Sequence, residues 1–449
     1  MPPNQTLIKN GIVLTLDDHL GNFPRGDVLI EGSKIAAVGP NLEADDAHVI
    51  DAANHIVMPG FIDTHRHIWQ GIIRNMGADH ALGDYFANIM GVLSPVYRPQ
   101  DAYAGNYVSA LGAIDAGITT LLDWSHIQIT PEHTDAAINA LQDSGIRGVF
   151  AYGTPHLKTT DWWEVTDHPE NMRRVAKQYF SSKDQLLSFA RAPRGPDLTE
   201  YEVAVADWGL ARDLGIRITV HVGVGQYGGL GKLAQMGRDG YLGPDTTYIH
   251  CNALSDEEFQ MIADTGGTVS VSSSIEMQMG HGIPPIQRML NNGIRPSLSA
   301  DVETAIAGDM FTQMRSVFAI QRALAHDRVE KGLDEAPTLL TVRDMLQFAT
   351  IEGARANDLE DKVGTLTPGK QADIILLRTD RLNVMPLNDP IGAVVQSMDT
   401  SNVDSVFIAG QAKKRDGELV GVDLNAVQNM VTESRDYVVK TSGYTPPEI

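Results

Sequence analysis

The stretch Met58-Pro59-Gly60-Phe61-Ile62-Asp63-Thr64-His65-Arg66-His67-Ile68-Trp69-Gln70 organises this 449-residue chain. Pro59 and Gly60 mark a turn, and the apolar residues after them can start a buried strand. His65 and His67 stand two residues apart, so in a strand their side chains project to the same face. Two imidazoles placed this way can bind one divalent cation at the end of a strand. The pair alone does not establish a metal site, because this spacing is common by chance.

The chain between residues 60 and 359 alternates strand-like and helix-like patterns. Eight strands are expected at 60–64, 118–122, 148–151, 186–189, 216–220, 247–249, 268–271 and 296–298. Helical patterns lie between them, as at 100–116, 132–144, 199–214 and 256–265. Eight strands alternating with helices over this length predict an α/β fold, a (β/α)8 TIM-type barrel.

Polar residues follow the expected strands at the point where each one ends. They are His65, His67, Asp123, His126, His156, Arg191, Arg194, His221, His250, Ser272 to Ser274 and Asp301. The active site of such a barrel lies at the carboxyl ends of its strands. We therefore expect these side chains to meet at one mouth of the barrel.

Both ends of the chain carry short strand patterns separated by glycines. They lie at 12–16, 27–30 and 34–38, and again at 372–377 and 405–410. We predict a small β-sandwich domain built from residues 1–59 plus 360–449, ending in a helix over 423–440. Residues 60–359 would then form the barrel domain.

Composition restricts the partners. A net charge of −22 argues against nucleic acid, whose binding requires clustered basic residues. The single cysteine, Cys251, excludes an internal disulfide. The sequence shows neither a signal peptide nor a membrane span, so we expect a cytoplasmic protein.

The helix pattern at 309–324 is expected to pack on the barrel and to contribute to a homo-oligomer interface.

Three imidazoles and one carboxylate, from His65, His67, His221 and Asp301, suit one divalent metal, Zn²⁺ first and Fe²⁺ or Mn²⁺ as alternatives. Such a metal lowers the pKa of bound water towards about 7 and yields a hydroxide nucleophile. His250 is placed to stabilise developing charge, and Asp301 can accept the proton of the water. The alternative for each residue is a side chain that packs at the barrel rim and bonds a backbone group.

Longer motifs identify a family resemblance. Besides the first-strand motif, with Gln70 and Arg74 as its continuation, they are 248–258 (YIHCNALSDEE), 279–285 (MGHGIPP), 299–301 (SAD) and 364–373 (GTLTPGKQAD). The chain resembles the amidohydrolase superfamily over nearly its whole length. It is most similar to the mononuclear-metal branch that includes cytosine, guanine and S-adenosylhomocysteine deaminases and triazine chlorohydrolases.

The resemblance implies His65, His67, His221 and Asp301 as metal ligands and His250 as a catalytic residue. It also implies a glutamate three residues after His221 that carries a proton to the leaving group, and here that position is Val224. Ammonia leaves poorly unless it is protonated. Glu276, His281 and Glu303 are the candidate replacements and candidate substrate-binding residues. For the two glutamates the alternative is a helix cap or a solvated acid.

Two further features concern ligands. Residues 223–228 fit Gly-x-Gly-x-x-Gly after a strand, as a dinucleotide-binding turn would, but we favour a flexible loop over the barrel mouth. Trp69 can stack on a planar ring or pack in the core, and Gln70 can pair with ring nitrogens. Trp162 and Trp163 are expected to cover the pocket or to mark a subunit contact.

We therefore predict a metal-dependent hydrolase in which a metal-bound hydroxide attacks an sp² carbon of a planar nitrogen heterocycle or an amidine-like group. Hydrolytic deamination is the main prediction. Hydrolysis of a cyclic amide, carbamate or carbon–halogen bond is the alternative, because the glutamate is absent. A non-catalytic structural member of the fold and a dinucleotide-dependent oxidoreductase are the competing classes.

Overall fold

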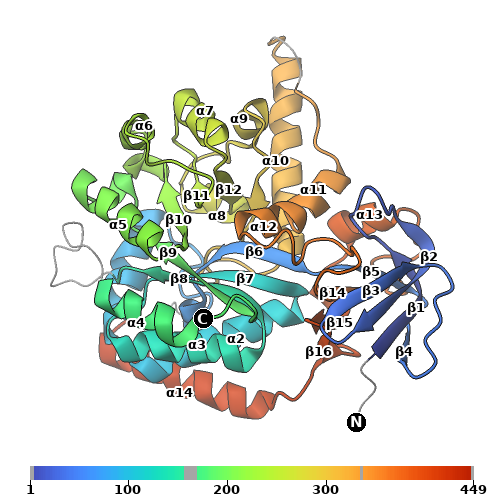
Figure 1. Cartoon of the computed structure of the whole chain (residues 1–449). Coiled ribbons are helices and arrows are strands. Elements are labelled where there is room, and N and C mark those ends of the chain that lie inside the picture. The colour runs from blue at the N-terminus through green and yellow to red at the C-terminus, as the bar shows by residue number, and fades with distance from the viewer. Residues whose placement is uncertain (1–4, 156–168, 334–336, 446–449) are drawn as a thin grey trace.

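A parallel eight-stranded barrel forms the centre of the molecule (Figure 1). The computed structural model describes residues 5–155, 169–333 and 337–445. The barrel strands are β6 Phe61–Arg66, β7 Ile118–Ser125, β8 Arg147–Gly153, β9 Leu187–Ala192, β10 Arg217–Val222, β11 Thr246–His250, β12 Thr268–Val271 and β13 Ser297–Leu298. They pair in sequence order from β6 to β13, which confirms all eight expected strands and the fold class.

The last strand and the first strand meet at the residues that matter for the site. Thr64 Oγ1 donates to the carbonyl oxygen of Leu298 at 3.0 Å. The amide of Asp301 donates to the carbonyl oxygen of His65, and the amide of His67 donates to that of Asp301, both at 2.9 Å. These bonds nearly close the barrel, and they fix the strand-eight aspartate beside the strand-one histidines.

Helices surround the barrel and cover the outer faces of its strands, which are therefore buried (Figure 1). They are α1 Leu82–Asp84, α2 Pro99–Asp115, α3 Pro131–Ser144, α4 Pro169–Tyr179, α5 Tyr201–Asp213, α6 Lys232–Arg238, α7 Asp256–Asp264, α8 Ser273–Gln278, α9 Ile286–Asn291, α10 Met310–Glu330, α11 Val342–Phe348 and α12 Ile351–Ala356. Short 3-10 or π turns complete the connections: η1 Ile68–Ile73, η2 Tyr85–Leu93, η3 Ser94–Val96, η4 Pro196–Leu198 and η5 Gly225–Tyr227. Local sequence explains the ends; Ser255 and Glu258, for example, form the capping box that starts α7.

A second sheet combines strands from both ends of the chain. Its strands are β1 Gln5–Val13, β2 Phe23–Glu31, β3 Lys34–Gly39, β4 His48–Asp51, β5 His55–Pro59, β14 Ile374–Arg378, β15 Val403–Ile408, β16 Gln411–Arg415 and β17 Glu418–Leu419. β5 and β14 pair antiparallel, which joins the two halves of the sequence. The buried Arg147 of the barrel binds Asp373, just before β14, through two hydrogen bonds of 2.7 and 2.9 Å. We propose the domain division 1–59 plus 360–449 and 60–359 on this basis.

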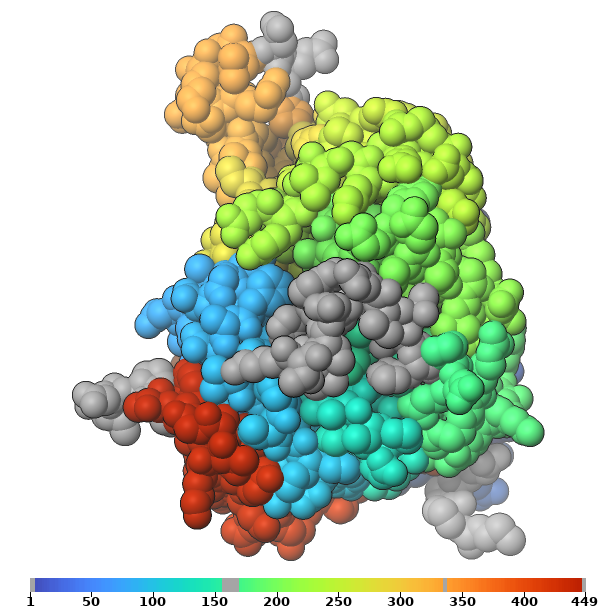
Figure 2. Space-filling view, turned by 90° about the vertical axis from the view of Figure 1, so that its left-hand side faces the viewer, coloured from blue at the N-terminus to red at the C-terminus, as the bar shows by residue number. Residues whose placement is uncertain are grey.

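The chain after β14 carries α13 Pro390–Gly392, the turns η6 Ala393–Ser397 and η7 Thr400–Asn402, and the final helix α14 Leu424–Ser442. Asp423 caps the start of α14, and Gly443 ends it with a φ of +71°. α14 lies against α2, η1 and η2, as the red helix at the lower left of Figure 2 shows. None of the described helices combines the length and apolarity that crossing a membrane requires.

Two expected elements differ in their limits. The strand expected at 12–16 has the wrong limits, since β1 runs from Gln5 to Val13. The chain leaves the strand after Val13 because Thr15 Oγ1 donates to the carbonyl oxygen of Gly21 in a turn and Leu16 has a φ of +54°. The helix expected at 309–324 continues to Glu330, since no glycine or proline interrupts it before Gly332. Its last turns project beyond the barrel (Figure 1).

Candidate metal centre and active site

Five side chains converge at the carboxyl ends of strands β6, β10, β11 and β13. They are His65, His67, His221, His250 and Asp301. His65 Nε2 lies 3.2 Å from His221 Nε2 and 3.1 Å from Asp301 Oδ1. His67 Nε2 lies 3.4 Å from the same carboxylate oxygen. The sequence-predicted residues are thus brought together within one cluster.

These separations can be compared with the geometry of a metal site. Zinc bound at 2.0–2.1 Å by tetrahedral ligands requires donor atoms about 3.3 Å apart. The spacings His65–His221, His65–Asp301 and His67–Asp301 are close to that value. His250 Nε2 lies 3.7 Å from Asp301 Oδ2, on the other oxygen of the carboxylate. The donors of His65, His67 and Asp301 lie within 4.8 Å of one another, and so do those of His65, His221 and His250. The two groups share His65, so the cluster offers a divalent cation imidazole and carboxylate ligands on neighbouring sides.

The protonation of the histidines also suits metal binding. Burial, reinforced by the neighbouring His65, lowers the pKa of His67 to about 3, and burial lowers the pKa of His221 well below its ordinary value. Both rings are thus neutral at neutral pH, so each offers a lone pair. His67 Nδ1 donates to the carbonyl oxygen of Trp124 at 2.7 Å, which leaves Nε2 facing the cluster.

The backbone is strained at this cluster. Asp301, His250 and Cys251 have φ values of +63°, +72° and +64°, in the left-handed region that few side chains adopt. Such strain gathers at functional sites because the surrounding fold has to hold it in place. Burial opposes ionisation of Asp301, but His65, His250 and His67 together outweigh it and hold the pKa of Asp301 well below its ordinary value. Asp301 is therefore an anion.

Glu276 orients His250 from behind. His250 Nδ1 donates to Glu276 Oε1 at 3.1 Å. That oxygen also accepts from the amide of Ser272 at 2.8 Å, and Glu276 Oε2 accepts from Asn252 Nδ2 at 3.3 Å. Burial favours neutral His250, yet the bond to Glu276 and the charge of Asp301 together raise the pKa of His250. Its Nε2 consequently faces Asp301 and the cavity.

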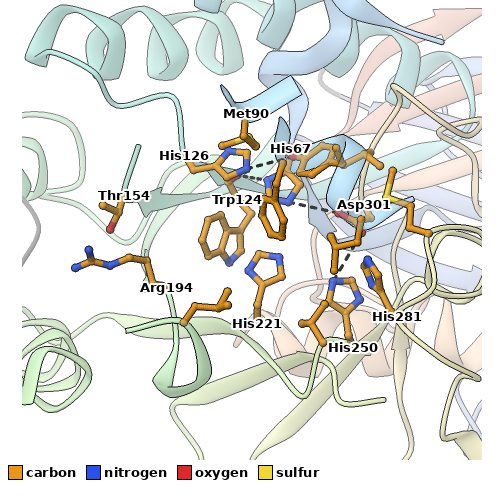
Figure 3. A pocket seen from close by; sticks show the side chains of 17 residues that line it. His67, Met90, Trp124, His126, Thr154, Arg194, His221, His250, His281 and Asp301 are labelled. Carbon is orange, nitrogen blue, oxygen red and sulfur yellow. Dashed lines mark hydrogen bonds and ion pairs between the residues drawn. The ribbon is translucent and has the colours of Figure 1, made fainter. Parts of the chain in front are cut away.

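A cavity of about 730 Å³ opens onto the cluster (Figure 3). Its wall is mostly apolar and includes Phe86, Met90, Trp124 and Met279. His281 is among the polar side chains that line it, and its ring meets the ring of His250 edge-on at 4.7 Å. Neither ring nitrogen of His281 has a hydrogen-bond partner in the described part of the chain.

Comparison with known proteins agrees with this geometry. The model of the Amidohydrolase family matches residues 56–413. The chain belongs to this family. The predicted resemblance and the predicted enzyme class are therefore confirmed.

Proteins similar to this amidohydrolase are named as deaminases and as a chlorohydrolase. The chain is 29% identical to a 5'-deoxyadenosine deaminase of Methanothermobacter thermautotrophicus over 89% of this chain and 91% of that protein. It is 26% identical to a 5-methylthioadenosine/S-adenosylhomocysteine deaminase of Pyrococcus furiosus, over 93% and 97% of the two chains. An adenosine deaminase from Xanthomonas campestris with bound zinc shares the fold, with a TM-score of 0.86, 21% identity and coverage of 97% and 98%. Atrazine chlorohydrolase of Arthrobacter aurescens TC1, also complexed with zinc, gives a TM-score of 0.83 at 21% identity, over 96% and 100%.

Other candidate residues of the amidohydrolase lie behind the cavity wall. Trp69 is fully buried, and its Nε1 donates to His126 Nδ1 at 2.8 Å. Gln70 Nε2 donates to the Tyr85 hydroxyl at 2.7 Å. Among the described residues, four of the predicted substrate-binding residues do not line the cavity: Trp69, Gln70, Glu276 and Glu303. Their side chains lie behind the residues that form its wall.

Glu303 has a different environment from Glu276. Its Oε1 accepts from Arg74 Nη2 at 3.0 Å and lies 3.4 Å from Arg66 Nη1, while Ser109 Oγ donates to its Oε2 at 2.5 Å. Both oxygens of this carboxylate are thus already engaged by two arginines and a hydroxyl. Of the three candidates for the position of the missing glutamate, only His281 presents its side chain to the cavity.

The glycine-rich segment after β10 forms a loop and not a nucleotide-binding turn. The strand is followed by the single turn η5, and α6 begins only at Lys232. Gly225 has a φ of +50°, and a Cβ there would lie 3.0 Å from the carbonyl oxygen of Gly280. The loop therefore packs against the segment that carries His281, and Val224 lines the cavity. His156, Trp162 and Trp163 lie outside the described residues.

Some lining residues carried no signal in the sequence. Leu82, Tyr85, Phe86 and Met90 come from α1 and the π-helical turn η2, between β6 and α2. Their spacing resembles that of any apolar helix, so only the path of the loop reveals that they face the site.

Asp123 on β7 gives this region a pH-dependent stability. Burial raises the pKa of Asp123 from its ordinary value of 3.8 to about 8. Between these values the folded state holds a proton that the unfolded state releases, so stability falls as pH rises, by at most about 1.4 kcal/mol per unit. Asp123→Asn cannot ionise. We expect the unfolding free energy of the wild type to drop about 3 kcal/mol more than that of the variant between pH 5 and 7.5. Urea unfolding measures this; parallel pH profiles would contradict it.

Proposed function

We propose that this chain is a zinc-dependent amidohydrolase that deaminates a planar nitrogen heterocycle. The observation that carries the proposal is the donor cluster of His65, His67, His221 and Asp301 beside His250, in which neighbouring donor atoms lie 3.1 to 3.4 Å apart. Zn²⁺ is proposed over Fe²⁺ or Mn²⁺ because the structural neighbours named above contain zinc.

The residues around the cation have separable roles in this proposal. A divalent metal at the cluster supplies water activated for attack at neutral pH. Asp301 accepts one proton of the attacking water and returns it to the departing nitrogen. His250, held by Glu276, donates from Nε2 towards the charge that develops on the substrate. Water adds to the sp² carbon, the carbon–nitrogen bond breaks, and ammonia leaves with the bonding electron pair.

The substrate class follows from the cavity and the relatives. Trp124 and Phe86 offer flat apolar surfaces to a ring, and the relatives are named as deaminases of adenosine derivatives. Hydrolysis of a cyclic amide, carbamate or carbon–halogen bond is not favoured by those names. A cytoplasmic location and a homo-oligomer with residues 309–324 at its interface stay predictions.

The test combines metal content with product release. The purified protein, resupplied with zinc, is analysed for metal and then assayed for ammonia release from adenosine derivatives, aminopyrimidines and aminotriazines. We expect about one zinc per chain and release from at least one heterocycle. Absence of stoichiometric metal after resupply would overturn the hydrolase mechanism and favour a structural protein.

A further inference from the structure

A second cavity lies at the opposite end of the barrel from the metal cluster. It has a volume of about 1040 Å³, and its lining includes Arg147, Leu187 and Arg217, the first residues of β8, β9 and β10. The proposed hydrolysis uses no residue at this end of the barrel. The cavity is therefore a separate feature of the molecule.

Arg217 in this cavity is a cation that makes no direct ion pair with the described residues. Its Nη1 donates to the carbonyl oxygen of Pro244 at 3.0 Å and its Nη2 to Thr247 Oγ1 at 3.3 Å, both uncharged acceptors. Within the described chain no carboxylate lies within 4 Å of its guanidinium, although the protein carries a net charge of −22. Burial lowers the pKa of Arg217, and the more distant charges of Asp358, Asp245 and Glu360 offset this only in part. A partly buried cation left unpaired in an acidic protein is costly unless an anion joins it.

Asn357 supplies an independent observation in the same cavity. It follows α12, its exposed fraction is 5%, and neither its Nδ2 nor its Oδ1 has a hydrogen-bond partner among the described residues. Buried amides are almost always hydrogen-bonded, so an unsatisfied one beside a cavity points to a missing ligand or water. The amide and the guanidinium together can donate several hydrogen bonds to one anionic group.

The rest of the lining indicates what accompanies the anionic group. The stacked rings of Phe180 and Phe189, with centroids 4.9 Å apart, form an apolar wall. Lys183 and Lys362 add positive charge at the same cavity, and Asp358, the acidic residue among the described lining residues, is exposed. Arg147 is already neutralised by Asp373.

We infer that this cavity binds a small organic anion, with its carboxylate or phosphate on Arg217 and Asn357 and its apolar body against Phe180 and Phe189. The bound group compensates the unpaired guanidinium and satisfies the amide. Binding stabilises the folded chain, since the site does not exist in the unfolded chain. This inference is independent of the proposed deamination.

The test measures anion binding by the full-length protein. Phenyl phosphate and inorganic phosphate are titrated at constant ionic strength, by calorimetry and by thermal unfolding. Phenyl phosphate is expected to bind more tightly than inorganic phosphate and to raise the Tm of the wild type by at least about 1 °C. Arg217→Gln and Asn357→Leu are each expected to weaken binding tenfold or more and to remove the Tm response. The zinc content of both variants should equal that of the wild type.

Arg212→Gln is the matched control, because Arg212 lies nearby but is paired with Asp245 at 2.9 Å on the surface. It should leave the anion response intact. Two outcomes would overturn the inference: no response of the wild type to either phosphate, or an equal response in wild type and Arg217→Gln. In the second case a lower Tm of Arg217→Gln at every anion concentration would assign the arginine a purely structural role.

Discussion

Asp301→Asn is expected to lower ammonia release by about 1000-fold and to reduce the bound metal well below one per chain. The carboxylate contributes a negative donor atom 3.1 Å from His65 Nε2 and 3.4 Å from His67 Nε2. It is also the proposed acceptor of the proton from water, a role typically worth 10²–10⁴-fold. Loss of both contributions explains the size of the effect. Metal analysis and ammonia release of the zinc-resupplied variant provide the measurement.

This substitution separates charge from backbone geometry. Asp301 has a φ of +63°, and asparagine adopts that conformation as readily as aspartate. The backbone hydrogen bonds to His65 and His67 that nearly close the barrel can therefore persist. Asp380→Asn, which removes an exposed carboxylate paired with Arg378, is the control and should retain metal and activity. Full metal content and undiminished release in Asp301→Asn would contradict the proposed site.

The barrel was predictable because its strands are short, buried apolar runs followed by polar residues. His65, His67, His221, His250 and Asp301 stand at strand ends, and parallel strands of a barrel bring their carboxyl ends together. The sequence alone was sufficient for that part of the site. It was less informative at β1, where the apolar run 12–16 crosses a turn: Leu14 and Leu16 are buried without belonging to a strand.

Contacts that depend on the path of a loop could not be predicted. Trp69 and Gln70 stand two and three residues after His67, yet η1 turns them away from the cavity into the core beneath it. Glu276 reaches His250 across 26 residues because β11 and β12 are neighbours and α8 begins directly after β12. The positive φ at His250 and Asp301 is also invisible in the sequence. Such features arise from tertiary packing, which has no local signal.

His281→Phe is expected to reduce ammonia release by about 100-fold while metal content stays unchanged. His281 is buried and lines the cavity, and its backbone amide is held by the carbonyl oxygen of Glu276 at 2.9 Å. Burial lowers the pKa of His281 to about 3, so the ring is neutral and offers one donor and one acceptor. Since neither nitrogen has a partner in the described chain, we expect both to serve the substrate, including the departing nitrogen. Phenylalanine keeps the apolar contacts and removes both hydrogen bonds.

The leaving group distinguishes this role from simple packing. Asp301 delivers the proton to the departing nitrogen, and the neutral His281 holds that nitrogen by hydrogen bonding. Chloride needs neither, so the chloro analogue of the same heterocycle should lose less than about tenfold in kcat/KM with His281→Phe. His326→Phe, on the exposed end of α10, is the control and should match the wild type on both substrates. Equal losses on the amino and chloro compounds would show that His281 only shapes the cavity. A selective loss on the amino compound would place His281 at the departing nitrogen, beside the wall where Val224 stands in place of a glutamate.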